Sequence, residues 1–435
     1  MITTSVVSTI LFVFILGYTL ITLEHKIKIN KAAPALLAGM LVWAMLFLTA
    51  TSDQQELYTE ESQRHMGNTS SIVFFILGAM TVVELMDAHE GFSIITDRIA
   101  TQNKRKLLWI INTLTFFMSA LLDNMTTAIV MCALTNNMLS EKQDRWIFAG
   151  TIVISANAGG AWSPIGDVTT IMLWIKGNVT TSNIMTKLFV PSVIAVLLPL
   201  ALISRRMKDK TFTRPSKLLD NKTHVLSKRE QMTVFVIGIA TLLGAPTFKI
   251  LTHLPPFMGI LLGLAVLWLY TEIIHREHHR GQYTIAAIVR RIDHSSVLFF
   301  LGILIAVAGL ETAGILNHAS VWLDASIGNL YVLSGVIGAL SSIVDNVPLV
   351  AAVQGMYPIA GANVVYPTDH LFWEAIALSA GTGGSMLVIG SAAGVAAMGV
   401  SGINFGWYLR KITVPATIGY LGSLATFWLQ NQFFH

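Results

Sequence analysis

The sequence has one cysteine, Cys132, and a low content of charged residues. A single cysteine inside an apolar run excludes a disulfide framework and a cysteine-based metal site. Asp, Glu, Lys and Arg make up 12% of the 435 residues, whereas soluble domains carry about 25%. The net charge is +4, but the basic residues lie in short loops between apolar runs, so they do not indicate a nucleic-acid partner.

The sequence is rich in long hydrophobic runs. Hydrophobic residues make up 54% of the chain, and uninterrupted apolar runs of about 18 residues or more recur from one end to the other. Runs of this length match the hydrocarbon core of a bilayer and are typical of membrane-spanning helices. The sequence therefore predicts an all-α polytopic membrane protein surrounded by the lipid bilayer.

The loops between the runs differ in charge. Residues 25–31, 100–106, 205–229 and 275–291 are basic, whereas residues 52–63 form an acidic loop. Because basic loops stay in the cytoplasm, this pattern predicts that the N-terminus and the C-terminus both lie outside. We expect a multi-pass protein of the inner (plasma) membrane of the cell.

The strongest pattern is an internal repeat with an offset of 224 residues. The first copy enters the membrane from outside and the second from the cytoplasmic side, so the two copies are predicted to have inverted topology. Inverted repeats with interrupted helices are typical of secondary transporters. The matching pairs include Ser155 with Ser379, Gly159-Gly160 with Gly383-Gly384, Ile165-Gly166 with Ile389-Gly390 and, at an offset of 222 residues, Asp123-Asn124 with Asp345-Asn346.

The repeat divides the chain into four predicted parts. They are an N-terminal scaffold helix pair (1–70), the first repeat (71–206), basic cytoplasmic loops with a linking helix pair (207–294), and the second repeat (295–435).

Each repeat is expected to contain a full span, a re-entrant hairpin, a broken helix and a closing helix. The hairpin arms of about 15 residues reach the middle of the bilayer at about 1.5 Å per residue but are too short to span it comfortably. Gly-rich stretches at 158–164 and 381–385 are the predicted breaks. The hairpins are 107–139 and 331–360, and the broken helices are 146–176 and 372–402.

Asp123 and Asp345 lie at the predicted tips of the two hairpins. A carboxylate near the bilayer centre costs at least about 2.5–3.5 kcal/mol, so it needs either a basic partner or a function. The neighbouring apolar arms contain no basic residue, which favours a function. Burial raises the pKa of a carboxylate and a bound cation lowers it, so such a site binds a proton or a cation in competition.

Polar residues near these tips complete the candidate site. Asn124 and Asn346 offer amide oxygens, although asparagine is also common at a tight turn. Asp167 either compensates a helix dipole or binds an ion directly, and its repeat mate is Ser391. The first repeat is the more polar copy, so Na⁺ is expected at Asp123, Asn124, Asn157 and Asp167. The cation- and proton-binding candidates are Asp123, Asn124, Asn157, Asp167, Thr169, Thr170, Asp345, Asn346, Ser379 and Thr382.

Two further groups of charged residues give weaker signals. Glu84 and Asp87 lie near the cytoplasmic end of the first span, where they could line an exit path or simply reach water. The string 275–280 is rich in His and Arg, but a solvated cytoplasmic loop explains it better than a metal site or a pH sensor.

Three strings of this sequence closely resemble those of the NhaD-type sodium/proton antiporters. That family belongs to the ion transporter superfamily, which also includes arsenite and dicarboxylate carriers. The resemblance implies exchange of Na⁺ or Li⁺ for H⁺, no cofactor, and a homodimer in which a transport part moves against a scaffold like an elevator. The strings are Leu122-Asp123-Asn124-Met125-Thr126-Thr127-Ala128, the run from Asn157 to Thr170, and Val344-Asp345-Asn346-Val347-Pro348.

Two other functions are less well supported. An anion carrier of the same superfamily would have this architecture, but aspartate at both tips would repel a carboxylate substrate. An intramembrane aspartyl protease uses a Gly-x-Gly-Asp string, and in this sequence Pro164 stands three residues before Asp167. We therefore expect a transporter and no enzyme.

Overall fold

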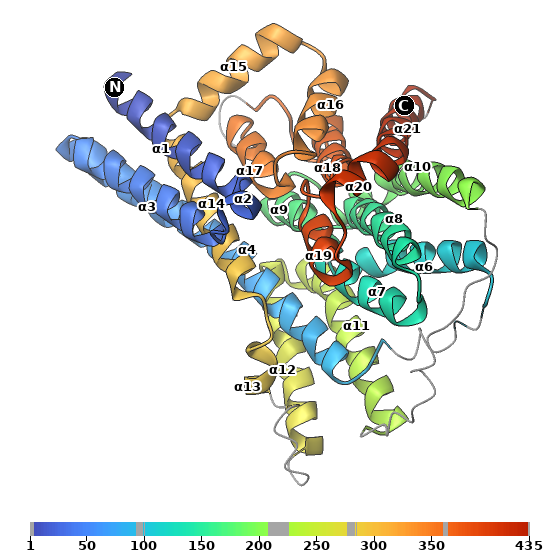
Figure 1. The fold of residues 1–435 in the computed structure, drawn as a ribbon. Coiled ribbons are helices and arrows are strands. Elements are labelled where there is room, and N and C mark those ends of the chain that lie inside the picture. Colours follow the sequence, from blue (N-terminus) through green and yellow to red (C-terminus); the bar gives the residue numbers. More distant parts are fainter. Residues whose placement is uncertain are drawn as a thin grey trace.

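The computed structural model describes residues 4–92, 99, 101–207, 226–275, 283, 285–359 and 364–433. Every regular element in these ranges is a helix, as the sequence predicts (Figure 1). Most of the basic loop 205–229, the string 275–280 from residue 276 on, and the last residue of the hairpin 331–360 lie outside the described residues.

The helices of the described ranges follow one another from the N-terminal to the C-terminal end of the chain. They are α1 (Thr4–Thr22), α2 (Glu24–Ile27), α3 (Ala32–Thr49), α4 (Ser52–Ala88), α6 (Lys104–Ser119), α7 (Asn124–Met138), α8 (Lys142–Ala161), α9 (Val168–Lys176), α10 (Thr181–Arg206), α11 (Lys228–Thr252), α12 (Pro256–His275), α13 (Ile285–Val289), α14 (His294–Thr312), α15 (Ile315–Ile327), α16 (Leu330–Ser341), α17 (Asn346–Met356), α18 (Leu371–Gly383), α19 (Ala392–Ser401), α20 (Phe405–Lys411) and α21 (Thr413–Phe433).

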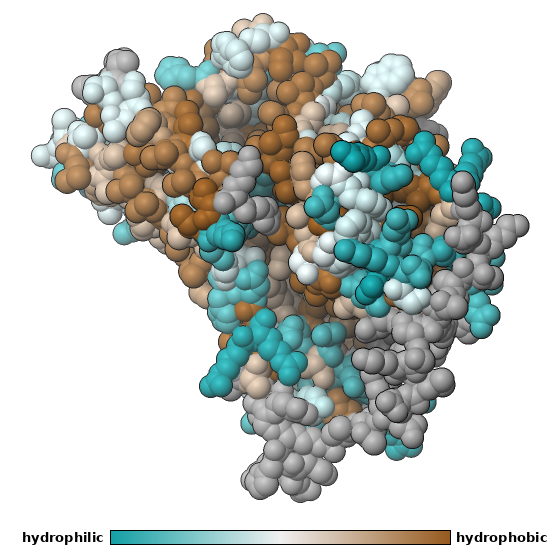
Figure 2. Space-filling view, viewed as in Figure 1, coloured by the Kyte–Doolittle hydropathy of each residue, from teal (hydrophilic) through white to brown (hydrophobic). Residues whose placement is uncertain are grey.

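Seven of the described helices are long and apolar enough to cross a membrane, or up to nine spans if two bent pairs are each counted as one. Large hydrophobic side chains remain exposed on these helices, for example Phe12 at 64%, Leu37 at 58% and Leu48 at 85%. Figure 2 shows this hydrophobic surface on the side formed by α1 and α3. Exposed apolar surface of this extent is what a bilayer covers, so the chain is a multi-pass membrane protein.

The N-terminal region differs from the prediction in one respect. Residues 52–63 were expected to be an acidic loop, but they form the first turns of α4, a helix of 37 residues. Thr51 and Gln54 form a capping box at its start, which satisfies backbone groups that a loop would leave to water. The boundary predicted at residue 70 therefore lies inside one helix.

The two predicted hairpins are pairs of short helices. In the first, α6 and α7 are joined by residues 120–123, and in the second α16 and α17 are joined by residues 342–345. The helix α15, which meets α16 at an angle of 117°, was not predicted.

The two broken helices pack against each other near the middle of the molecule (Figure 1). Helices α8 and α9 form one, and α18 and α19 form the other. Both predicted breaks were placed too early in the chain: α8 continues to Ala161 and α18 to Gly383. Of the glycines that were interpreted as breaks, Gly159, Gly160, Gly381 and Gly383 are helical residues, and Gly384 directly follows α18.

Close packing explains these glycines better than chain breaking does. A Cβ atom at Gly159 would lie 2.2 Å from the Phe116 carbonyl oxygen, and one at Gly383 would lie 2.1 Å from the Gly338 carbonyl oxygen. Each glycine therefore lets a hairpin arm lie directly against a broken helix. The two glycines are repeat mates, and the contact is the same in both copies.

Side-chain hydrogen bonds repeat in the same way. Ser119 Oγ donates to the Ala156 carbonyl, and Ser341 Oγ donates to the Ala380 carbonyl at 2.8 Å. The copies thus share local packing as well as sequence. Their inverted orientation in a membrane stays a prediction.

Candidate functional site

Asp167 is the centre of a buried polar cluster. It precedes α9, and its side chain is buried with the residue 1% exposed. Asn124 Nδ2, from the start of α7, donates to Asp167 Oδ2 at 2.8 Å, and Asn346 Nδ2, from the start of α17, donates to the same oxygen at 3.1 Å. The tips of both hairpins therefore meet at one carboxylate of the first broken helix.

Asn157 connects this carboxylate cluster to the second broken helix. Its Oδ1 accepts a hydrogen bond from Asn124 Nδ2 at 3.1 Å. Its Nδ2 donates to Ser385 Oγ at 3.0 Å and to Ser391 Oγ at 2.8 Å. One buried amide on α8 thus joins the first hairpin tip to the segment that breaks α18 from α19.

Helix capping explains how the local sequence positions these groups. Asp167 caps α9 by accepting a hydrogen bond from the Thr169 amide at 3.1 Å, and Ser391 caps α19 by accepting from the Gly394 amide at 3.2 Å. The aspartates at the hairpin tips likewise cap the helices that follow them. Each carboxylate is held at a helix N-terminus, where the helix dipole favours negative charge.

Asp123 lies beside this cluster and faces a cavity. Its Oδ1 accepts from the Thr126 amide at 2.8 Å, and the side chain makes no ion pair with any residue in the described ranges. The cavity is mostly apolar and lies between the first hairpin tip, α4, α9 and α14. Its lining includes Asp123, Asn124, Phe75, Val168, Ser296 and Phe300.

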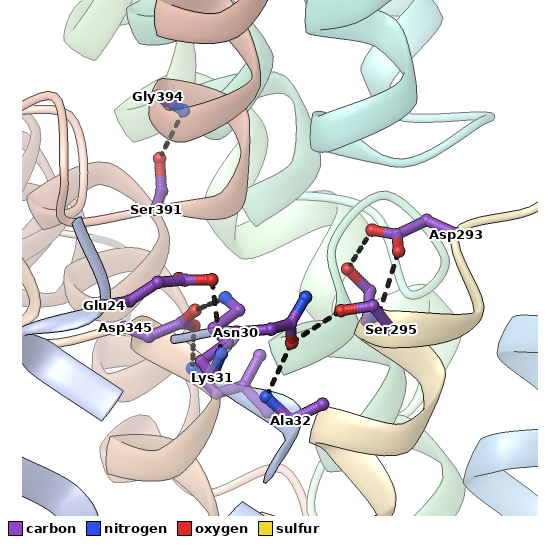
Figure 3. A network of polar contacts seen from close by, with 11 residues as sticks. Glu24, Asn30, Lys31, Ala32, Asp293, Ser295, Asp345, Ser391 and Gly394 are labelled. Carbon is purple, nitrogen blue, oxygen red and sulfur yellow. Dashed lines mark hydrogen bonds and ion pairs between the residues drawn. The ribbon is translucent and has the colours of Figure 1, made fainter. Parts of the chain in front are cut away.

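Asp345 has a basic partner, contrary to the expectation from the sequence. Lys31 Nζ, from the N-terminal end of α3, lies 2.8 Å from Asp345 Oδ2 (Figure 3). The prediction failed because it considered only the neighbouring arms of the hairpin, whereas Lys31 is 314 residues away in the chain. The two tip aspartates, equivalent in sequence, therefore have different electrostatic surroundings.

The remaining predicted site residues are placed less centrally. The Thr170 hydroxyl donates to the Asp167 carbonyl at 2.9 Å, so it serves the start of α9. The Thr382 hydroxyl donates to Leu378 within its own helix, and Ser379 packs against Gly338 of the second hairpin. The Thr169 amide donates to Asp167 Oδ1 at 3.1 Å. Thr170 forms a capping box with Asp167 at the start of α9, so both threonines hold this carboxylate through the backbone.

Three residues that the sequence analysis left out of the site contribute to it: Lys31, Ser385 and Ser391. Ser391 could have been found, because it is the repeat mate of Asp167. Ser385 and Lys31 carry no comparable signal. Glu84, for which the sequence left both an exit path and simple contact with water open, forms an ion pair with Arg291, with Oε1 and Nη1 3.8 Å apart.

The chemistry of the cluster suits a monovalent cation. In the part of the chain that the structure describes, no three of His, Cys, Asp and Glu lie close enough together to hold a metal ion. The set around Asp167 is instead one carboxylate with neutral amides and hydroxyls. Hard alkali cations prefer oxygen ligands of this kind. Because an asparagine side chain has both a donor and an acceptor, the same residues can satisfy the carboxylate or turn an oxygen to a cation.

Comparison with known proteins places this geometry in a family. A family model described as "Citrate transporter" matches residues 10–374. Sodium/proton antiporter 1 of Arabidopsis thaliana is 45% identical over 95% of this chain and 71% of its own length. The Na⁺/H⁺ antiporter NhaD of Vibrio cholerae is 32% identical over 97% of this chain and 91% of its own length.

A solved structure has a similar fold. The YdaH transporter of Alcanivorax borkumensis aligns with a TM-score of 0.53 at 11% identity, over 92% of this chain and 97% of that one. At that identity the match supports the fold alone. The sequence relatives are closer, and they cover nearly the whole chain. The chain therefore belongs to the family of NhaD-type sodium/proton antiporters.

Proposed function

We propose that this protein exchanges Na⁺ or Li⁺ for H⁺ across the membrane by alternating access. The observation that carries this proposal is the meeting of both hairpin tips at the single buried carboxylate of Asp167. A carboxylate removed from water is neutralised by either a proton or a cation, so binding one releases the other. The relatives named as sodium/proton antiporters support the same function.

In this proposal the residues of the site have separate roles. Asp167 binds the cation, with oxygens of Asn124, Asn157 and Asn346 around it. Asp123 faces the cavity without an ion-pair partner in the described ranges, so it takes up the cation or the proton on the way to Asp167. No covalent step is involved.

A citrate or other anion carrier is the second candidate, because the matching family model is described as a citrate transporter. The charge of the site argues against it. Asp167 is buried and its side-chain neighbours are neutral amides. Lys31, at the second hairpin tip, is already paired with Asp345, so the described site has no free positive charge to balance a carboxylate substrate.

Everted membrane vesicles separate the two functions. With an acidified lumen reported by a fluorescent dye, we expect NaCl and LiCl to release protons, and choline chloride to release none. Potassium citrate should give no more release than potassium chloride. Vesicles from the same host without this protein are the control. Citrate-dependent release without a sodium response would overturn the proposed exchange.

We further propose the inner (plasma) membrane as the location, with both termini outside, and a homodimer as the assembled form. The contact between Gln231 Nε2 and Glu90 Oε2, at 3.1 Å, places the start of α11 beside the far end of α4. The acidic start of α4 and the basic residues Lys228 and Arg229 at the start of α11 therefore lie at opposite ends of α4, which supports the proposed orientation.

Cysteine labelling tests this orientation. Cys132 is buried, so it gives little background. In whole cells, an impermeant maleimide should react with Gln55→Cys and should not react with Arg229→Cys until the membrane is opened. Both positions are exposed on the protein surface. Equal labelling of the two in intact cells would contradict the predicted orientation.

A further inference from the structure

An ion pair joins the N-terminal helix pair to the tip of the second hairpin. Lys31 Nζ and Asp345 Oδ2 are 2.8 Å apart, and the two side chains are only 17% and 13% exposed. Figure 3 shows the pair with Glu24 and Asn30 beside it, in the segment that leads from α2 into α3. The contact is thus shielded from water on most sides, unlike an ordinary surface ion pair.

Lys31 occupies a position where a positive charge is otherwise unfavourable. It is the residue that caps the N-terminus of α3, and the positive end of a helix dipole repels an ammonium group. Two contacts compensate for this: the Asp345 carboxylate, and the ring of Phe299, whose centroid is 4.2 Å from Nζ. The backbone amide of Lys31 also donates to Glu24 Oε1 at 3.2 Å, which fixes the start of α3.

The residue after Asp345 reaches the cation site. Asn346 Nδ2 donates to Asp167 Oδ2 at 3.1 Å, while Asp345 binds Lys31. Adjacent residues of one hairpin tip therefore contact different parts of the molecule: Asp345 contacts the N-terminal helix pair, and Asn346 contacts Asp167. A movement of the tip backbone at Asp345 would therefore also displace the adjacent Asn346.

The first hairpin has no equivalent of this arrangement in the described ranges. Asp123 is the repeat mate of Asp345, and it makes no ion pair with any described residue. Its neighbour Asn124 reaches Asp167 as Asn346 does. The two tips thus differ in their ion pairs: Asp345 has the ammonium group of Lys31 as a partner, and Asp123 has no such partner among the described residues.

We propose that Lys31 is a positioning residue for the cation site. Its ammonium group balances the charge of Asp345 and sets the second hairpin tip so that Asn346 reaches Asp167. The role of Asp345 then differs from that of Asp123: it anchors the tip and does not carry the transported cation. This inference rests on the proposed exchange of Na⁺ for H⁺.

Variants of the two residues test the inference by the Na⁺ concentration that gives half-maximal exchange. Lys31→Gln should raise that concentration about tenfold, equivalent to about 1.4 kcal/mol, because the tip loses its anchor. Lys31→Arg keeps the charge and should stay close to the wild type. Lys31→Gln combined with Asp345→Asn removes both charges together, and it should require less Na⁺ than either single variant.

The opposite assignment predicts a different pattern. If Asp345 is itself a cation ligand, Lys31→Gln leaves the Na⁺ requirement unchanged or lowers it, and the double variant is as defective as Asp345→Asn. That pattern would overturn the inference. If Lys31→Gln fails to insert, the double variant compared with Asp345→Asn still distinguishes the two patterns.

A second measurement separates failure of this inference from failure of the proposed function. The melting temperature of the purified protein in detergent should rise on adding NaCl, because a ligand that binds the folded state stabilises it. Lys31→Gln should need more NaCl for the same rise. No rise in the wild type would count against sodium binding itself, whereas an equal rise in both proteins would count against the role of Lys31.

Discussion

Replacing Asp167 with asparagine should abolish sodium/proton exchange while leaving the fold intact. Asparagine caps a helix about as well as aspartate, so α9 keeps its N-terminus. The charge that binds the cation in the proposed exchange is lost, however, and hydrogen bonds to a charged group are worth about 1.5–3 kcal/mol each. Two such bonds come from Asn124 and Asn346. We expect exchange to fall by about 100-fold or more.

Glu374→Gln is the matched control for this variant. Glu374 is also 1% exposed, but it lies at the start of α18 and accepts a hydrogen bond from Asn183 Nδ2 at 2.6 Å, outside the cluster around Asp167. It should retain most of the exchange activity. Dye release from vesicles with equal protein content measures both variants. Near wild-type exchange in Asp167→Asn would show that this carboxylate is only a helix cap.

Asp123→Asn should also lose nearly all exchange, for a different reason. Asparagine can accept the hydrogen bond from the Thr126 amide, so the start of α7 is kept. What disappears is the one acidic group among the described residues that line the cavity beside the cluster. We expect a fall of about 100-fold, with a rate that no longer responds to pH in the range where the wild type does.

Asp345→Asn is the variant with which Asp123→Asn should be compared. The two aspartates are repeat mates and both cap a hairpin helix, but of the two only Asp345 has Lys31 as a partner. Asp345→Asn should mainly raise the Na⁺ requirement and keep a measurable maximal rate. Exchange and pH response would be measured in the same vesicles. Identical defects in the two variants would contradict the difference in role.

Several residues that the sequence singles out lie together in the structure. Intramembrane carboxylates are rare and costly, so Asp123, Asp167 and Asp345 were visible as candidates without any structure. The repeat then connected the two hairpin tips, and the structure brings Asn124, Asn157 and Asn346 to Asp167 as neighbours.

Lys31 shows what the sequence could not supply. It lies in a short basic loop, where the positive-inside rule already accounts for a lysine. Nothing in its neighbourhood signals a partner 314 residues away. A contact between residues so far apart in the chain depends on how α3 and α17 are both arranged around α14. The hydropathy of the sequence contains no information about that arrangement.

The errors in the fold have similar physical causes. Gly159 and Gly383 were interpreted as helix breakers because glycine lowers helix propensity, but tertiary packing overrides that preference where a backbone must approach closely. The helix α15 was missed because its 13 residues mix apolar and polar side chains and are too short to span a bilayer. Hydropathy identifies spans well and other helices poorly.

The unbroken helix α4 connects the wall of the cavity to an exposed end of the molecule. Phe75 and Ile76, which line the cavity beside Asp123, lie on the same unbroken helix as the exposed end at Gln55. The 20 residues from Gln55 to Phe75 cover roughly 30 Å at 1.5 Å per residue. A tilt of about 10° at the cavity would therefore move the outer end by roughly 5 Å. A small tilt beside the site therefore gives a larger displacement at the exposed position Gln55, where a spin label or a fluorophore can follow it.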